Sequence, residues 1–167
     1  MQKLDKEYLE QIKRYHVLAL DVATNCGYYS VYDYGTWHFP KNDSAAARKR
    51  GSDYGQHKVF RKTLISFIKE YDIKVIAAED VIFGHFTDFR KLCELRGIML
   101  EVCETMNIPY VLFKPSDIKK FATGNGNANK QLMIEYAIKK WKIDPEKDDN
   151  VADSVHIFHY FCKRYGI

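Results

Sequence analysis

The segment Val17-Leu18-Ala19-Leu20-Asp21 joins four apolar residues to an acid. A short, continuous apolar run of this kind is typical of a central strand that is buried on both faces. The same pattern returns at Val75-Ile76-Ala77-Ala78-Glu79. If the two strands are parallel and adjacent, Asp21 and Glu79 emerge at the same carboxyl edge of one sheet, where open α/β sheets bind ligands.

Strand and helix patterns alternate around these two runs. The first strand is expected at residues 15–23, and aromatic and β-branched residues predict two more at 28–32 and 36–39, with turns at 24–27 and 33–35. Apolar residues at helical spacing predict helices, and the run after Pro109 predicts a last strand at 110–113. The expected helices cover residues 5–14, 56–71, 87–106, 116–121, 129–141 and 151–162. The predicted fold class is α/β, a mixed sheet with an antiparallel three-strand meander plus parallel strands, flanked by helices.

Composition limits the class of protein. The 167 residues fit one domain, and a net charge of +4 permits a polyanionic partner without requiring one. No apolar run approaches the roughly 20 residues that span a bilayer, and the charged N-terminus does not resemble a signal peptide. The four cysteines form no CxxC pair and have no nearby histidine at zinc spacing, so we expect free thiols in a reducing cytoplasm: Cys26, Cys93, Cys103 and Cys162.

A third acid stands in an apolar setting. Asp153 lies in Val151-Ala152-Asp153-Ser154-Val155, near the start of an almost wholly apolar helix. Burying an isolated carboxylate is costly, so Asp21, Glu79 and Asp153 call for a shared explanation. Each acid taken alone is as well explained as a turn-former or a helix cap, and capping is the stronger interpretation of Asp148, Asp149 and Asn150.

A divalent cation would remove the repulsion between three converging carboxylates. Oxygen ligands without sulfur favour Mg²⁺, with Mn²⁺ as a substitute, over zinc. Two such ions about 3.5–4 Å apart are the usual means of phosphodiester hydrolysis. We therefore expect Mg²⁺, two ions per site, held by Asp21, Glu79 and Asp153.

A basic, glycine-containing segment runs from Lys114 to Lys130. Its glycine-interrupted loop before a helix can present backbone N–H groups to a phosphate, and Lys119, Lys120 and Lys130 can contact a DNA backbone. Its spacing fits neither a Walker loop nor a dinucleotide fingerprint. A plain helix–loop–helix with solvated lysines remains an alternative explanation.

Two further segments are candidates for DNA contact. Phe83 follows Glu79 in a glycine-containing loop and could wedge between bases, although core packing explains it equally well. Residues 41–55 form a polar loop that carries the basic run Arg48, Lys49 and Arg50.

Read together, these segments resemble the RuvC family of Holliday junction resolvases, which have a ribonuclease H-like fold. The resemblance runs from Tyr15 to the last residue. Leu18-Ala19-Leu20-Asp21-Val22-Ala23 followed by Gly27 resembles the opening motif, and Ala78-Glu79-Asp80-Val81 resembles the second acidic motif. The most specific match is Pro115 to Lys130, which follows the family pattern of a Pro, a Lys in a short helix and Gly-x-Gly-x-Ala-x-Lys. Asp149-Asn150-Val151-Ala152-Asp153-Ser154 resembles the terminal motif.

The resemblance implies roles for these residues. Asp21, Glu79 and Asp153 would be metal ligands, and Lys119 and Lys130 would contact DNA near the scissile phosphate. The family has Asp or His three residues before the final Asp, where this chain has Asn150, so the fourth ligand is either Asn150 or Asp149. The family's wedge aromatic falls at Ile82 rather than Phe83, and the long basic loop before residue 55 suggests a phage-type or divergent member.

The resemblance also implies domain limits and a function. Residues 1–14 would be an N-terminal extension and residues 15–167 a single nuclease domain. We expect a magnesium-dependent endodeoxyribonuclease that resolves four-way DNA junctions or related branched DNA as a homodimer. It would act in the cytoplasm of a bacterium or a phage-infected host and would not bind a membrane. The alternatives are a less selective flap or branched-DNA nuclease, a junction-binding module weakened by Asn150, and a phosphotransferase of a distantly related ATPase type.

Overall fold

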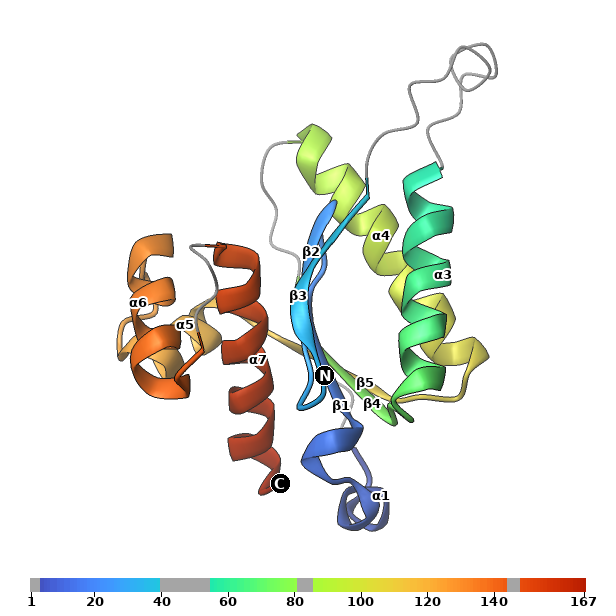
Figure 1. Cartoon of the computed structure of the whole chain (residues 1–167), viewed down its shortest axis with the longest axis horizontal. Coiled ribbons are helices and arrows are strands. Elements are labelled where there is room, and N and C mark those ends of the chain that lie inside the picture. Colours follow the sequence, from blue (N-terminus) through green and yellow to red (C-terminus); the bar gives the residue numbers. More distant parts are fainter. Residues whose placement is uncertain (1–3, 40–54, 81–85, 144–147) are drawn as a thin grey trace.

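A five-stranded mixed sheet forms the centre of the protein in a computed structural model that describes residues 4–39, 55–80, 86–143 and 148–167 (Figure 1). The strand order is β3-β2-β1-β4-β5. The strands are β1 (Val17–Asp21), β2 (Asn25–Tyr29), β3 (Tyr34–His38), β4 (Val75–Glu79) and β5 (Tyr110–Phe113). β1 to β3 form an antiparallel meander, whereas β1, β4 and β5 run parallel. The predicted fold class and the adjacency of the two apolar strands are confirmed.

Helices cover both faces of this sheet (Figure 1). On one face lie α3 (Gly55–Glu70) and α4 (Phe86–Thr105). On the other lies α7 (Asp149–Tyr165), with α5 (Pro115–Thr123) and α6 (Lys130–Trp141) packed outside it. Alternate residues of the central strands therefore face different cores, and both cores are apolar. Leu18, Leu20 and Ile76 pack with the side of α3 and α4, while Val17, Ala19 and Val75 pack with α5 and α7.

The second and third strands of the meander begin and end earlier than predicted. Residues 25–27 were expected in a turn but belong to β2, and the turn that joins β2 to β3 lies at residues 30–33. Ser30 closes it: its backbone N–H donates to the Asp33 carbonyl at 2.9 Å, and its hydroxyl accepts the N–H groups of Tyr32 and Asp33 at 3.2 and 3.1 Å. Side-chain hydrogen bonds of serine are thus sufficient to place a turn where no glycine stands.

The chain before β1 packs on the domain. Helix α1 (Lys6–Gln11) is followed by a 3₁₀ turn, η1 (Arg14–His16). Ile12 is buried in the core beneath α7, and the Tyr8 hydroxyl donates to the Lys74 carbonyl at 2.6 Å. The arginine that opens the 3₁₀ turn reaches the far end of α7, where Arg14 Nε donates to the Ile167 carbonyl at 3.1 Å.

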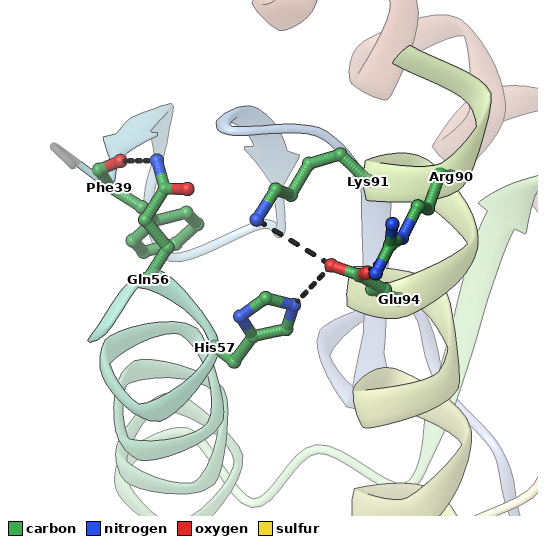
Figure 2. A network of polar contacts seen from close by, with 6 residues as sticks. All are labelled: Phe39, Gln56, His57, Arg90, Lys91 and Glu94. Atoms are coloured by element: carbon green, nitrogen blue, oxygen red, sulfur yellow. Dashed lines mark hydrogen bonds and ion pairs between the residues drawn. The ribbon is translucent and has the colours of Figure 1, made fainter. Parts of the chain in front are cut away.

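Glu94 joins α3 to α4 on the outer layer (Figure 2). Its carboxylate lies 2.9 Å from His57 Nε2, 3.1 Å from Arg90 Nε and 3.5 Å from Lys91 Nζ. The amide nitrogen of Gln56, next to His57, donates to the Phe39 carbonyl at the end of the meander. These contacts fix the start of α3 against both α4 and the chain leaving β3. Within the described ranges, no helix is long and apolar enough to cross a membrane.

Candidate nuclease site

Asp21 and Glu79 end two neighbouring parallel strands. β1 and β4 pair in the register Leu20↔Ala78, so each acid is the next residue along its strand and both emerge at the same sheet edge. The four residues before each acid are buried, whereas the acids themselves are partly exposed. The predicted position of these two acids, at the carboxyl edge of neighbouring parallel strands, is therefore found.

Gly27 explains how the third acid reaches this edge. Gly27 pairs with Asp21 across β1 and β2, and the first turn of α7 lies directly against it. A Cβ atom built on Gly27 would overlap the carbonyl carbon and oxygen of Asn150 and would lie 3.0 Å from Asn150 Cβ. Only a glycine at this position lets the helix backbone touch the strand, and this contact places Asp153, one turn further along α7, within electrostatic reach of Asp21.

Hydrogen bonds to Asp148 hold the start of α7. Asp148 is the N-cap residue, and its carboxylate accepts the Asn150 backbone N–H at 2.9 Å and the Asn150 amide nitrogen at 2.8 Å. The Thr36 hydroxyl of β3 donates to the other carboxylate oxygen at 2.5 Å. Burial opposes the ionisation of Asp148, but these hydrogen bonds outweigh it and lower its pKa. The capping interpretation of Asp148 is confirmed; the contribution of Thr36 was not predicted, because its partner lies 112 residues away.

The three acids suppress one another's ionisation. Burial raises the pKa of Asp21 well above its usual value, and the charges of Asp153 and Glu79 raise it further. Burial followed by the charge of Asp153 raises the pKa of Glu79 to about 7. Burial followed by the charge of Asp149 raises the pKa of Asp153 to about 6. Carboxylates that affect each other in this way lie within electrostatic reach across a poorly solvated space.

Two lysines of the predicted basic segment face these acids. Lys130 Nζ forms an ion pair with Asp149, and its charge opposes the rise in the pKa of both Asp21 and Asp153. The charge of Lys119 does the same for Glu79 and Asp153. The adjacent Lys120 points elsewhere, into a separate groove with Phe121 and Tyr160. α5 and α6 therefore bring Lys119 and Lys130 to the acidic edge, and leave Lys120 outside it.

The neighbouring Asp80 is fixed by Arg96, which stands before Gly97 in an Arg-Gly pair that resembles one on the corresponding RuvC helix, but whose partner was not predicted. Arg96 of α4 forms an ion pair with Asp80 at 2.5 Å and is largely buried, and the Asp80 N–H donates to the Phe113 carbonyl at 2.7 Å. The feature of the sequence that could have indicated this ion pair is an arginine on the helix that follows a strand ending in acidic residues. The other DNA-contact candidates lie outside the described residues: Arg48, Lys49, Arg50 and Phe83.

The chemistry of the donor set fits hard divalent cations. Asp21, Glu79, Asp153 and Asp149 supply carboxylate oxygens, and Asn150 supplies an amide. Among the residues that the structure describes, no three Asp, Glu, His or Cys side chains already stand close enough to hold one metal ion. The site thus has the ligand types and the unfavourable negative charge that a cation would relieve, without a closed cage of ligands.

A family model described as Crossover junction endodeoxyribonuclease RuvC matches residues 24–159. The chain belongs to the RuvC family. The matched range begins three residues after Asp21 and contains Glu79, Lys119, Lys130 and Asp153. The expected family is confirmed.

Proteins with similar sequences carry the name of this family. A crossover junction endodeoxyribonuclease RuvC of Brachyspira hyodysenteriae is 32% identical over 110 residues, which cover 65% of this chain and 68% of that protein. Another RuvC, of Pseudothermotoga lettingae, is 32% identical over 109 residues, covering 63% of this chain and 66% of the relative.

Solved structures share the fold. RuvC from Thermus thermophilus in complex with Holliday junction substrate superposes with a TM-score of 0.67 at 16% identity, covering 90% of this chain and 95% of that one. The yeast mitochondrial Holliday junction resolvase superposes with a TM-score of 0.55 at 16% identity, covering 98% and 92%. These matches confirm the ribonuclease H-like architecture of the RuvC family.

Proposed function

We propose that this chain is a structure-selective DNA endonuclease that resolves four-way junctions by metal-dependent phosphodiester hydrolysis. Membership of the RuvC family supports the reaction class, and the sheet edge supports the position of the site. The observation that carries the proposal is the gathering of Asp21, Glu79 and Asp153 at one edge, with raised pKa values that a divalent cation would lower again.

In this proposal, Asp21, Glu79 and Asp153 hold Mg²⁺, two ions per site, and Mn²⁺ can replace it. Ions held there would supply Lewis-acid activation of a water molecule and stabilisation of the leaving 3′ oxygen. For the fourth ligand we favour the amide oxygen of Asn150 over Asp149. The Asn150 amide nitrogen donates to Asp148, whereas the Asp149 carboxylate forms an ion pair with Lys130.

Lys119 and Lys130 position the scissile strand. The charges of both lysines act on Asp153 and lower its pKa. A phosphodiester entering between them would meet two positive charges on the side opposite the carboxylates. We assign them to holding the phosphate and to offsetting the negative charge that develops during attack.

A homodimer suits the symmetry of the substrate. A four-way junction has approximate two-fold symmetry, and a two-fold symmetric dimer presents two identical sites to two opposed strands. Each site would nick one strand and leave a 5′ phosphate and a 3′ hydroxyl.

The proposal is tested by nicking of a synthetic four-way junction, a Y-fork and a linear duplex in Mg²⁺. We expect paired, symmetric nicks in the junction, much weaker cutting of the other two substrates, and junction binding without nicking by Asp21→Asn. Equal cutting of fork and junction would indicate a less selective nuclease. Tight junction binding with no nicking by the wild type, in Mg²⁺ or Mn²⁺, would contradict the nuclease proposal and indicate a binding module.

A further inference from the structure

Two hollows on the outer side of α7 adjoin each other at Arg164. The first, of about 370 Å³, lies between α5 and the end of α7 and is lined by Lys120, Phe121, Tyr160 and Lys163 besides Arg164, with Asp117 as its acid. The second, of about 690 Å³, lies between α1 and the end of α7. Arg164 lines both hollows, so they lie next to each other, and together they are here called the α7 track.

The α7 track is strongly basic. Its lining holds six cationic side chains and two acids, Asp117 and Glu10. All six cationic residues are exposed, and none of them forms an ion pair within the part of the chain that the structure describes. The six are Lys6, Lys13, Arg14, Lys120, Lys163 and Arg164. A row of cations without acidic partners is the electrostatic footprint of a polyanion-binding surface.

Packing holds the track in place. Lys163 Nζ lies 5.4 Å from the centre of the Phe121 ring, which pins the side chain against α5. Lys140 reaches the same ring from α6 and donates to the Ala122 carbonyl at 2.5 Å. At the other end, the hydrogen bond from Arg14 to Ile167 ties the 3₁₀ turn to the end of α7.

Most of the track lies outside the part of the chain that matches the RuvC family. The family model covers residues 24–159, and of the six cations only Lys120 falls within that range. The two segments beyond the match, before residue 24 and after residue 159, are far apart in sequence but meet here. The track is therefore a feature of this chain that the family match does not account for.

The track and the candidate nuclease site share the helices α5 and α7. On α5, the charge of Lys119 lowers the pKa of Glu79 and Asp153, while the neighbouring Lys120 lines the track. One lysine of this helix therefore faces the acids and the next faces the track. Along α7, Lys163 lies ten residues beyond Asp153, which is about 15 Å at 1.5 Å per residue. That distance corresponds to roughly four base pairs of duplex at about 3.4 Å each.

We infer that the α7 track binds the phosphate backbone of a duplex arm of the branched DNA, beginning roughly four base pairs from the cleaved phosphate. The inference rests on the proposed function, because it takes its ligand from that proposal. Its contacts are to backbone charge, so they would add affinity without adding sequence preference.

The test is the salt dependence of junction binding, measured in EDTA so that nicking does not enter. The variant is Lys163→Gln with Arg164→Gln in the full chain. Each phosphate contact contributes about 0.9 to the slope of log K against log salt, so we expect the double variant to lower the slope by about 2 and to bind at least about tenfold more weakly at 0.1 M salt.

The matched control removes two positive charges from the opposite face. Lys62 and Lys69 are exposed on α3, and neither forms an ion pair within the described ranges, so Lys62→Gln with Lys69→Gln changes the net charge equally. We expect the control to keep the wild-type slope to within about 0.5. An equal fall in slope for both double variants would mean that only net charge matters, and it would overturn the inference.

A second measurement locates the contact. Replacing charged phosphates by methylphosphonates roughly four to eight base pairs from the cut should weaken binding by the wild type and leave the double variant unaffected. A wild-type slope in the Lys163→Gln, Arg164→Gln protein would overturn the inference. If that protein also lost binding to anionic vesicles, the track would be assigned to a membrane surface instead. A wild type that binds the junction with the expected slope but never nicks it would contradict the proposed function alone. No junction binding by the wild type would overturn both.

Discussion

The backbone of Asn150 rests on Gly27 with no room for a side chain between them. This contact sets the distance between the sheet and the start of α7, and it therefore decides whether Asp153 can stand beside Asp21. We predict that Gly27→Ala lifts the first turn of α7 away and destabilises the protein by about 3 kcal/mol, because overpacking a close backbone contact forces the helix to move. Chemical denaturation and Mg²⁺ affinity would both show the loss.

Gly97 provides the matched control for this substitution. It lies within α4, and a Cβ built on it meets nothing within 4 Å. Gly97→Ala should leave Mg²⁺ affinity unchanged and stabilise the protein by about 0.5–1 kcal/mol, since alanine favours a helix interior over glycine. Equal effects of the two substitutions would mean that the contact with Asn150 has no special importance.

Removing the charge of Asp21 should stabilise the metal-free protein. Because the pKa of this acid, and those of Glu79 and Asp153, are raised on folding, the folded state binds more protons than the unfolded one between about pH 4 and 7. Stability from this site is thus present at low pH and falls as pH rises through that window. Asp21→Asn should raise the free energy of unfolding by about 1–3 kcal/mol at pH 7.5 in EDTA, and by almost nothing at pH 4.

The same experiment has an exposed carboxylate as its control. Glu104→Gln on α4 removes an equal charge from the surface and should change stability by less than about 0.5 kcal/mol at either pH. If Asp21→Asn were as neutral as Glu104→Gln, or destabilising at pH 7.5, the acids would not be repelling one another.

Lys130 should matter for turnover rather than for folding. Its charge acts on Asp21 and Asp153, but its side chain is exposed, and the N-cap of α6 is the neighbouring Asn129, which accepts the Leu132 N–H at 2.9 Å. We predict that Lys130→Gln lowers kcat for junction nicking about 100-fold with an unchanged Tm. Lys139→Gln on the same helix should nick at the wild-type rate; a similar loss in both would point to general electrostatics instead.

Two histidines of α7, His156 and His159, make the free energy of unfolding depend on pH. His159 stacks on Trp141 with ring centres 3.7 Å apart, and His156 accepts the Trp141 indole N–H at 2.9 Å. Burial lowers the pKa of each histidine to about 4. The unfolded chain therefore binds more protons than the folded one between about pH 4 and 6.5, so this contribution to stability is lost as pH falls through that window.

His159→Phe keeps a ring for the Trp141 stack but cannot bind a proton. Between pH 7 and pH 5 the variant should lose less of its free energy of unfolding than the wild type, by up to about 2 kcal/mol. Urea denaturation at the two pH values measures the difference. Identical losses in the two proteins would show that His159 titrates normally in the folded state.

The central strands were predictable because they are buried on both faces. Val17 to Leu20 and Val75 to Ala78 form unbroken apolar runs that end in acids, and both strands and their parallel pairing follow from that pattern. The register of β2 and β3 was not predictable, because Gly27 indicates a turn when read locally. Its small size instead serves a helix that begins more than 120 residues later.

For the candidate site, the residues were easier to predict from the sequence than the contacts between their side chains. The charges of Asp21, Glu79, Asp153, Lys119 and Lys130 act on one another, since strand ends and helix starts fix where these residues lie, while their shared role in binding metal and DNA stays a prediction. Other contacts depend on how α4, α6 and α7 pack, which no local pattern encodes. Among them are the ion pair of Lys130 with Asp149, the bond from Thr36 to Asp148, and the stack of Trp141 on His159.

The most direct test of shared metal binding is a titration with Mn²⁺ at pH 7.5, followed by the electron paramagnetic resonance signal of the free ion. We predict saturable binding of Mn²⁺ to the wild type, weaker binding below about pH 7 as Glu79 takes up its proton, and loss of binding in Asp21→Asn and in Asp153→Asn. Glu104→Gln should bind as the wild type does. Equal Mn²⁺ binding by all four proteins would contradict a metal site built from these acids.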